Sequence, residues 1–195
     1  GARDFSRPFR ALVAGGGTGD AAIMLAQQLA DTGAKAEVVY LDWSKATRSI
    51  AESRAAVRKL TNIRFVTGSL IEFGQLDLGR FDYIDCCGVL HHLPDPATGL
   101  AALTGALNDD GGLGLMLYAR LGRTGVYPLQ EALRSLLTEA DSIDTRLAVA
   151  KKLLGQLPAT NWLKRNPFVT DHLTEGDSGI FDLLLRSEEH TSELQ

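Results

Sequence analysis

In the segment LVAGGGTGD (residues 12–20), an apolar run ends in alternating glycines just before a helix-like segment. Gly15, Gly17 and Gly19 form a GxGxG pattern, with Gly16 inside it. A backbone without side chains adopts positive φ easily and lets a ligand approach closely, while the next helix presents unpaired N–H groups. The stretch therefore predicts a ligand-binding loop at the end of the first strand.

Apolar runs alternate with segments of helical period along the first 119 residues. Strands are predicted at 9–15, 36–42, 62–69, 81–90 and 112–119, and helices at 20–33, 44–60 and 97–110. Near-continuous apolar strands separated by helices are typical of a parallel sheet that is covered on both faces. The predicted fold class is therefore α/β, with a doubly wound, mostly parallel sheet whose ligands bind outside the carboxyl ends of the strands.

The glycine spacing discriminates among nucleotide ligands. The dinucleotide fingerprint GxGxxG fails in both possible frames. Asp20 takes the place of the last glycine when counting starts at Gly15, and Ala14 takes the place of the first glycine in the other frame. No GK[ST] follows the loop, which disfavours a nucleoside triphosphate. The spacing therefore favours a ligand that combines a carboxylate with a nucleoside.

A second anchor is the tripeptide LDW, at the end of the second strand. Asp42 lies about 20 residues past the glycines, where an acid can accept hydrogen bonds from both ribose hydroxyls through its two oxygens. Trp43 follows it and can pack on adenine. Two structural roles stay open, because Asp42 could instead cap the helix that begins near Ser44, and Trp43 could be core packing.

Composition disfavours several other classes of protein. The 195 residues carry a formal net charge of −4 with scattered basic side chains, which gives no reason to expect a nucleic-acid partner. No apolar run is long enough for a membrane span. Cys86 and Cys87 point to opposite faces of a strand, which disfavours a disulfide between them. We therefore expect a cytoplasmic protein whose oligomeric state the sequence leaves open.

The ordered motifs of residues 9–119 resemble those of class I methyltransferases that use S-adenosylmethionine. They are VAGGGTGD (13–20), LDW (41–43), GSL (68–70), FDYIDCCGVLHHLPDP (81–96) and NDDGGLGLML (108–117). The resemblance implies a Rossmann-like methyltransferase fold and methyl transfer from S-adenosylmethionine to an unidentified small-molecule acceptor. An NAD(P)-type Rossmann oxidoreductase and a noncatalytic cofactor-binding module are the alternatives.

The resemblance also implies roles for individual residues. The expected cofactor-binding residues are Gly15, Gly16, Gly17, Gly19, Asp42, Trp43, Ser69, Leu70, Cys87 and Gly88. The glycines would hold the methionine half of the cofactor, and the residues at 69 and 70 would contact adenine. Two positions depart from the family: Val13 replaces a common acid, and Ser69 replaces a frequent aspartate. The backbone near Gly88 remains available for the methionine amino group.

His91 and His92 are the candidate catalytic bases. They follow the fourth strand beside the expected methyl position, and imidazole titrates near neutral pH. A base is needed only when the acceptor is a neutral hydroxyl or an ammonium group. Packing or a backbone hydrogen bond is the other role open to either histidine. No metal site is expected, because no cluster of Cys or carboxylate residues has ligand spacing.

Residues 120–185 are expected to form a helical segment that covers the substrate side of one methyltransferase domain spanning residues 1–185. Amphipathic helices are predicted at 126–140 and 143–157. Candidates for lining the substrate crevice are Tyr118, Arg120, Arg123 and Tyr127.

The end of the sequence differs in character from the rest. The last two strands of the family's sheet are not found before Leu185 and are expected to be missing. The final residues RSEEHTSELQ (186–195) resemble a translated sequencing adapter, so they are treated as a non-native tail. The chain is therefore expected to be a fragment of a longer protein.

Overall fold

The chain forms two compact units in a computed structural model that describes residues 7–119, 121–138 and 140–185. Unit 1 ends at Leu117, and unit 2 begins at Tyr118. Arg120 and the segment 186–195 lie outside the described residues, so the predictions made for them have no structural counterpart.

Unit 1 contains a parallel five-stranded sheet with the strand order β3-β2-β1-β4-β5. Its strands are β1 (Phe9–Ala14), β2 (Ala36–Asp42), β3 (Ile63–Thr67), β4 (Phe81–Cys87) and β5 (Leu107–Met116). Its helices are α1 (Asp20–Asp31), α2 (Lys45–Val57) and α3 (Pro96–Gly105), with the short 3₁₀ helices η1 (Phe73–Gln75) and η2 (Leu90–His92). Within the described residues the sheet holds these five strands. The predicted α/β class and Rossmann-like parallel sheet are confirmed.

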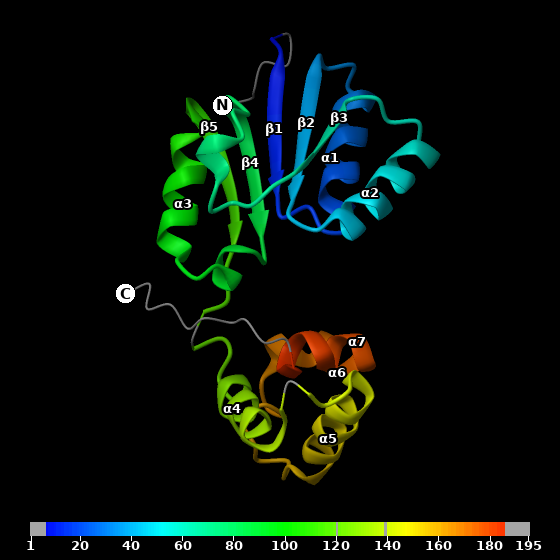
Figure 1. The fold of residues 1–195 in the computed structure, drawn as a ribbon, viewed down its shortest axis with the longest axis vertical. Coiled ribbons are helices and arrows are strands. Elements are labelled where there is room, and N and C mark those ends of the chain that lie inside the picture. The colour runs from blue at the N-terminus through cyan, green and yellow to red at the C-terminus, as the bar shows by residue number, and fades with distance from the viewer. Residues whose placement is uncertain (1–6, 120, 139, 186–195) are drawn as a thin grey trace. The chain divides into compact units, whose positions relative to one another are not determined.

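Helices cover the sheet on both faces, as Figure 1 shows. Successive residues of a strand point to opposite faces. In β1, Leu12 packs into a core with Leu103 of α3, whereas Val13 packs into a second core with Ala26 of α1 and Ala51 of α2. Burial on both faces explains why the strands read as continuous apolar runs.

The winding of the sheet reverses beside β1, which pairs with β2 on one side and with β4 on the other. The first two crossovers, through α1 and α2, lead away from β1 in one direction, and the chain then returns to place β4 on its other side. In open α/β sheets a crevice forms at such a reversal, outside the carboxyl ends of the strands. The fold therefore puts the end of β1 at the expected ligand position.

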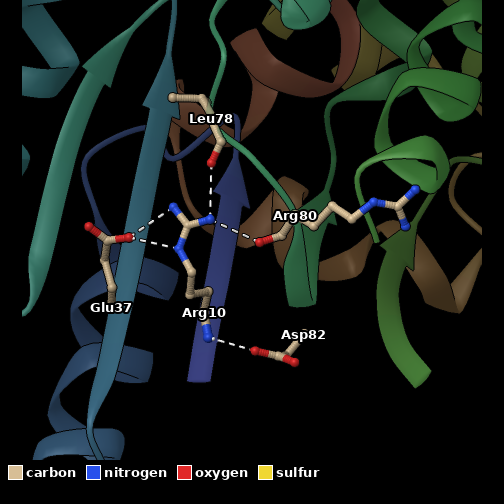
Figure 2. Close-up of polar contacts among 5 residues, drawn as sticks. All are labelled: Arg10, Glu37, Leu78, Arg80 and Asp82. Carbon is tan, nitrogen blue, oxygen red and sulfur yellow. Dashed lines mark hydrogen bonds and ion pairs between the residues drawn. The ribbon is translucent and has the colours of Figure 1, made fainter. Parts of the chain in front are cut away.

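Arg10 joins the amino end of β1 to the segment that leads into β4 (Figure 2). Its Nη1 donates to the carbonyl oxygens of Leu78 and Arg80 at 3.0 and 2.9 Å, and its Nε donates to Glu37 Oε2 at 3.0 Å. Its backbone N–H donates to Asp82 Oδ2 at 2.8 Å. These contacts hold together the amino ends of β1, β2 and β4.

The boundary between α3 and β5 was predicted wrongly. The helix expected to continue to Asp110 ends at Gly105, and the next strand begins at Leu107. Asn108 Nδ2 donates to Asp82 Oδ1 on β4 at 3.0 Å, and the register between β4 and β5 shifts at this point. A tertiary contact with β4 thus draws into the sheet residues that local pattern assigned to the helix.

Unit 2 is helical in its described residues (Figure 1). Its helices are α4 (Val126–Leu136), α5 (Ile143–Gln156), the 3₁₀ helix η3 (Pro167–Val169), α6 (Thr170–Thr174), α7 (Asp177–Ile180) and the π-helix η4 (Phe181–Leu185). Both predicted amphipathic helices are present, although the first ends before residue 140. No described helix is long and apolar enough to cross a membrane.

Arg123 belongs to the interior of unit 2, which corrects its predicted place in a crevice lining. Only 4% of the residue is exposed, and its guanidinium lies 3.9 Å from the ring centroid of Tyr118 and 5.9 Å from that of Tyr127. Its Nη2 also donates to the carbonyl oxygen of Leu183 at 3.5 Å. Aromatic faces and a carbonyl oxygen therefore contribute to holding this buried charge.

Candidate cofactor site

The predicted glycine loop links β1 to α1 through three residues with positive φ. The φ angle is +77° at Gly15, +51° at Gly17 and +95° at Gly19, a region that residues with a side chain rarely adopt. The N–H groups of Gly15 and Gly16 both donate to the carbonyl oxygen of Leu41, at 2.8 and 3.0 Å. The loop is therefore fastened to the end of β2.

Close packing requires glycine at the first two positions of the loop. A Cβ on Gly15 would overlap the side chain of Val89, which follows β4. A Cβ on Gly16 would overlap the ring of Tyr40 on β2. The loop thus lies between the ends of β2 and β4, as expected for a crevice beside β1.

The remaining two glycines differ in their surroundings. A Cβ on Gly19 would meet Ala51 of α2 at 2.7 Å, so this glycine permits the close packing of α1 and α2. A Cβ on Gly17 would meet nothing within 4 Å. Gly17 is therefore the loop position that leaves room for a ligand.

Asp42 is buried at the end of β2, with 8% of the residue exposed. Its Oδ2 accepts the N–H of Gly17 at 2.8 Å, while Oδ1 accepts the N–H of Ser44 at 2.8 Å and the hydroxyl of Thr47 at 3.2 Å. A carboxylate offers about four acceptor positions. The three protein donors leave about one acceptor position of Asp42 for a ligand. The sequence alone predicts that both oxygens accept hydrogen bonds from a ribose.

Ser44 is the N-cap of α2, as predicted, because its Oγ accepts the N–H of Thr47 at 3.3 Å. Asp42 supports the same turn through the N–H of Ser44. The two roles considered for Asp42, binding a ligand and stabilising the start of a helix, are therefore compatible in one side chain.

Residues expected near adenine lie next to Asp42. Trp43 is 81% exposed, which rules out the alternative that it is core packing. The N–H of Gly68 donates to the carbonyl oxygen of Asp42 at 3.0 Å, so the GSL motif begins beside the carboxylate. The Ser69 hydroxyl accepts a backbone N–H, and Leu70 is buried in the core. Only the main chain of Leu70 can therefore face a ligand.

The end of β4 carries two free thiols. Burial raises the pKa of Cys86 from its ordinary 9.0 to about 12. Partial burial and a hydrogen bond from its Sγ to Asp85 Oδ1, at 3.3 Å, raise the pKa of Cys87. Both thiols are therefore protonated near neutral pH and are poor nucleophiles. Gly88, with φ +73°, donates its N–H to the carbonyl oxygen of Met116 at 3.1 Å.

The two histidines lie on η2, directly after this strand end. Their ring centroids are 4.2 Å apart and their planes are tilted by 57°. His91 is buried, with 7% of the residue exposed, and His92 is half-buried. Of the two, His92 is therefore the more accessible to an acceptor. Within the part of the chain that the structure describes, no group of three or more His, Cys, Asp or Glu residues could hold a metal ion.

Val13 is buried in the core between the sheet and α1, so this position offers no carboxylate to a ligand. Its partner in register on β4 is Asp85.

Sequence reasoning missed one residue of the loop's support, Tyr40. Its hydroxyl donates to the carbonyl oxygen of Gly17 at 2.6 Å. The signal in the sequence was its place two residues before Asp42, because such residues share one face of a strand.

The parallel sheet with its reversal beside β1, and the glycine loop joined to a carboxylate at that point, define the Rossmann-like class of nucleotide-cofactor folds. The family model described as "Methyltransferase domain" matches residues 12–113. The chain belongs to this methyltransferase domain family, so the predicted family is confirmed and the oxidoreductase alternative is not favoured.

Curated relatives cover different shares of the chain. The chain is 39% identical over 167 residues to an uncharacterized protein of Synechococcus sp., covering 84% of this chain and 38% of that protein. It is 29% identical over 75 residues to the ubiquinone biosynthesis O-methyltransferase of Acinetobacter baylyi, covering 38% of this chain and 31% of that enzyme. The matched regions thus make up well under half the length of these relatives.

A solved structure shares the fold. PKMT2 from Rickettsia typhi, in complex with AdoHcy, has a TM-score of 0.71 with 20% sequence identity, covering 93% of this chain and 36% of that chain. At this identity the likeness concerns the fold alone.

Proposed function

We propose that the chain binds S-adenosylmethionine at the carboxyl ends of β1, β2 and β4 and transfers its methyl group to a small-molecule acceptor. The observation that carries the proposal is the open position at Gly17, whose N–H lies 2.8 Å from Asp42 Oδ2. The family match over residues 12–113 supports the reaction class. Binding of AdoHcy by the Rickettsia typhi protein of the same fold agrees with the choice of cofactor.

The residues present fit parts of this cofactor to different degrees. The bare backbone at Gly17 suits the methionine half, and the remaining acceptor position of Asp42 suits a ribose hydroxyl. The exposed indole of Trp43 suits adenine. The main chain at 69–70 and 87–88 completes the proposed binding set. The fit is weakest for the methionine amino group, because Val13 replaces the family's acid.

Bound S-adenosylmethionine supplies an electrophilic sulfonium methyl group. The task of the chain is to bind and orient both reactants, and such positioning can supply on the order of 7–11 kcal/mol. Both thiols stay protonated, so a covalent step on sulfur is not part of the proposal. His91 or His92 acts as the base for a neutral acceptor, and the greater exposure of His92 favours it.

A small-molecule acceptor is supported by the similarity to an O-methyltransferase of ubiquinone biosynthesis and by the acidic balance of the chain, with a net charge of −4. Residues 120–185 are proposed to serve the acceptor. They include a mainly apolar cavity of about 320 Å³ lined by Gly125, Pro128, Leu129, Thr160, Asn161 and Trp162. A cytoplasmic location is proposed because both cysteines are free thiols.

A noncatalytic cofactor-binding module is the second candidate function. The observation in its favour is the buried Val13, which leaves the methionine amino group without the family's carboxylate on β1. This candidate predicts cofactor binding without methyl transfer to any acceptor in a broad panel of hydroxyl, amine and carbon nucleophiles.

Calorimetric titration of the 195-residue chain with S-adenosylhomocysteine tests the proposed function. We expect saturable binding to the wild type and a loss of at least tenfold for Asp42→Ala. Asp109→Ala is the matched control, because the Asp109 side chain is fully exposed. Binding of NAD in place of S-adenosylhomocysteine would contradict the proposal.

A further inference from the structure

We infer that Tyr40 is a positioning residue that holds the glycine loop ready for the cofactor, an inference that rests on the proposed function. The Tyr40 hydroxyl donates to the carbonyl oxygen of Gly17 at 2.6 Å. Asp42, on the same face of β2, accepts the N–H of Gly17 at 2.8 Å. Both peptide groups that flank Gly17 are therefore fixed by residues of one strand, and they set the orientation of the open position.

The ring of Tyr40 is itself held in place. The side chain is fully buried, and its centroid lies 5.2 Å from that of Phe65 on β3. A Cβ on Gly16 would overlap the ring, so the ring supports the loop backbone directly. Burial raises the pKa of Tyr40, which keeps the hydroxyl protonated as a donor over the physiological range.

Losing the hydroxyl should loosen the loop without dismantling it. Arg54 of α2 donates from Nη1 to the carbonyl oxygen of Thr18 at 2.8 Å, and the N–H bonds of Gly15 and Gly16 to β2 remain. Binding to a loosened loop is weaker, because the loop must be ordered when the ligand binds and this costs conformational entropy. A preorganised loop is already ordered by folding. One hydrogen bond of this kind corresponds to a loss of affinity of about three- to tenfold.

The test compares Tyr40→Phe with the wild type by calorimetric titration with S-adenosylhomocysteine, well below both melting temperatures. Phenylalanine keeps the ring that packs on Gly16 and Phe65 and removes only the donor. Tyr83→Phe is the matched control, because it also removes a Tyr hydroxyl from a strand of unit 1. That hydroxyl donates to Asp85 on the same strand, at 3.5 Å, and not to the glycine loop. We expect a three- to tenfold higher Kd for Tyr40→Phe and an unchanged Kd for the control.

Two further measurements separate positioning from general stability. Phe65→Leu keeps the Tyr40 hydroxyl and leaves an apolar side chain beside its ring, so we expect a lower Tm and a smaller rise in Kd than in Tyr40→Phe. Amide exchange followed by NMR should find the Gly17 N–H protected at least tenfold in the free wild type, and faster exchange of this amide in Tyr40→Phe. The wild-type measurement tests the preset loop even if Tyr40→Phe fails to fold.

The outcomes distinguish the inference from the proposed function. A wild type that does not bind S-adenosylhomocysteine overturns both. A wild type that binds, with equal affinity in Tyr40→Phe, overturns the inference and leaves the proposed function standing. An unprotected Gly17 amide in the free wild type also overturns the inference.

Discussion

Gly17 and Asp42, 25 residues apart in the sequence, are joined by a hydrogen bond of 2.8 Å from the glycine N–H to the carboxylate. The bond unites two motifs that the sequence presents separately, the GxGxG loop and the acid at the end of β2. The bond therefore links the two anchors of the proposed cofactor site directly, and each anchor can be tested independently.

Substitution of the loop glycines should separate ligand binding from folding. Gly17→Ala adds a methyl group to open space, so we expect a loss of stability of about 1–2 kcal/mol from the positive φ alone. The same methyl group should lower the affinity for S-adenosylhomocysteine at least tenfold. Urea denaturation and calorimetry measure the two effects.

Gly16→Ala is the matched comparison, because its Cβ would overlap the Tyr40 ring. We expect this variant to lose at least about 2 kcal/mol of stability. Equal stability of the two variants would contradict the close packing of the Tyr40 ring on Gly16. Undiminished binding by Gly17→Ala would show that the open position at Gly17 does not face the ligand.

Trp43 should report cofactor binding by fluorescence. The chain has two tryptophans, and Trp43 is 81% exposed, so Trp43→Phe should change stability by less than about 0.5 kcal/mol. Stacking of an aromatic ring on adenine is worth about 0.5–1.5 kcal/mol and phenylalanine keeps part of it, so the substitution should weaken binding by less than about tenfold. Quenching by S-adenosylhomocysteine should vanish in Trp43→Phe and persist in Trp162→Phe. The reverse pattern would place the nucleoside elsewhere.

Raising the pH should destabilise unit 1 through Cys86. Its thiol titrates at 9.0 ordinarily and at about 12 in the fold, so between these values the unfolded chain has lost a proton that the folded chain retains. Stability is therefore highest below pH 9 and falls as the pH rises toward 12. From pH 8 to 10 the expected loss is about 1 kcal/mol, measured by urea denaturation. Cys86→Ala should have a shallower slope, and parallel slopes would contradict the assignment.

Arg10 should matter for stability and not for binding. Arg10→Met leaves the carbonyl oxygens of Leu78 and Arg80 without this donor, at an expected cost of about 1–3 kcal/mol. The half-exposed ion pair with Glu37 adds little. Arg58→Met, at the exposed end of α2, is the control and should stay within about 0.5 kcal/mol of the wild type. Reduced cofactor affinity in Arg10→Met would argue that the two ends of β1 are coupled.

Much of unit 1 could be predicted because its signals are local in sequence. The GxGxG loop, the acid of LDW and the continuous apolar strands each lie within a few residues, and together they indicate a parallel sheet with a ligand at one end. The α3–β5 boundary could not be predicted, because Asn108 is drawn to Asp82 across the sheet. The residues around Asn108 do not indicate that its hydrogen-bond partner lies on another strand.

Side-chain roles were predicted less completely than backbone roles. Tyr40 reads as one more apolar residue of β2, and only three-dimensional packing brings its hydroxyl to the carbonyl of Gly17. Arg123 was predicted to line a substrate crevice, yet its guanidinium lies on the ring of Tyr118 and donates to the carbonyl oxygen of Leu183, 60 residues later in the chain. In both cases the decisive partner is supplied by another element of the fold.

The crowded carboxylate of Asp42 has a consequence for sugar recognition. With Gly17, Ser44 and Thr47 already donating to it, Asp42 would offer one vacant lone pair to the two vicinal hydroxyls of the proposed cofactor's ribose. The Thr47 hydroxyl has a second acceptor in the Ser44 carbonyl at 3.1 Å, and turning toward it frees another. The two deoxynucleosides that each lack one of these hydroxyls should therefore differ in affinity. The larger loss is expected when the missing hydroxyl is the one that Asp42 accepts without displacing Thr47.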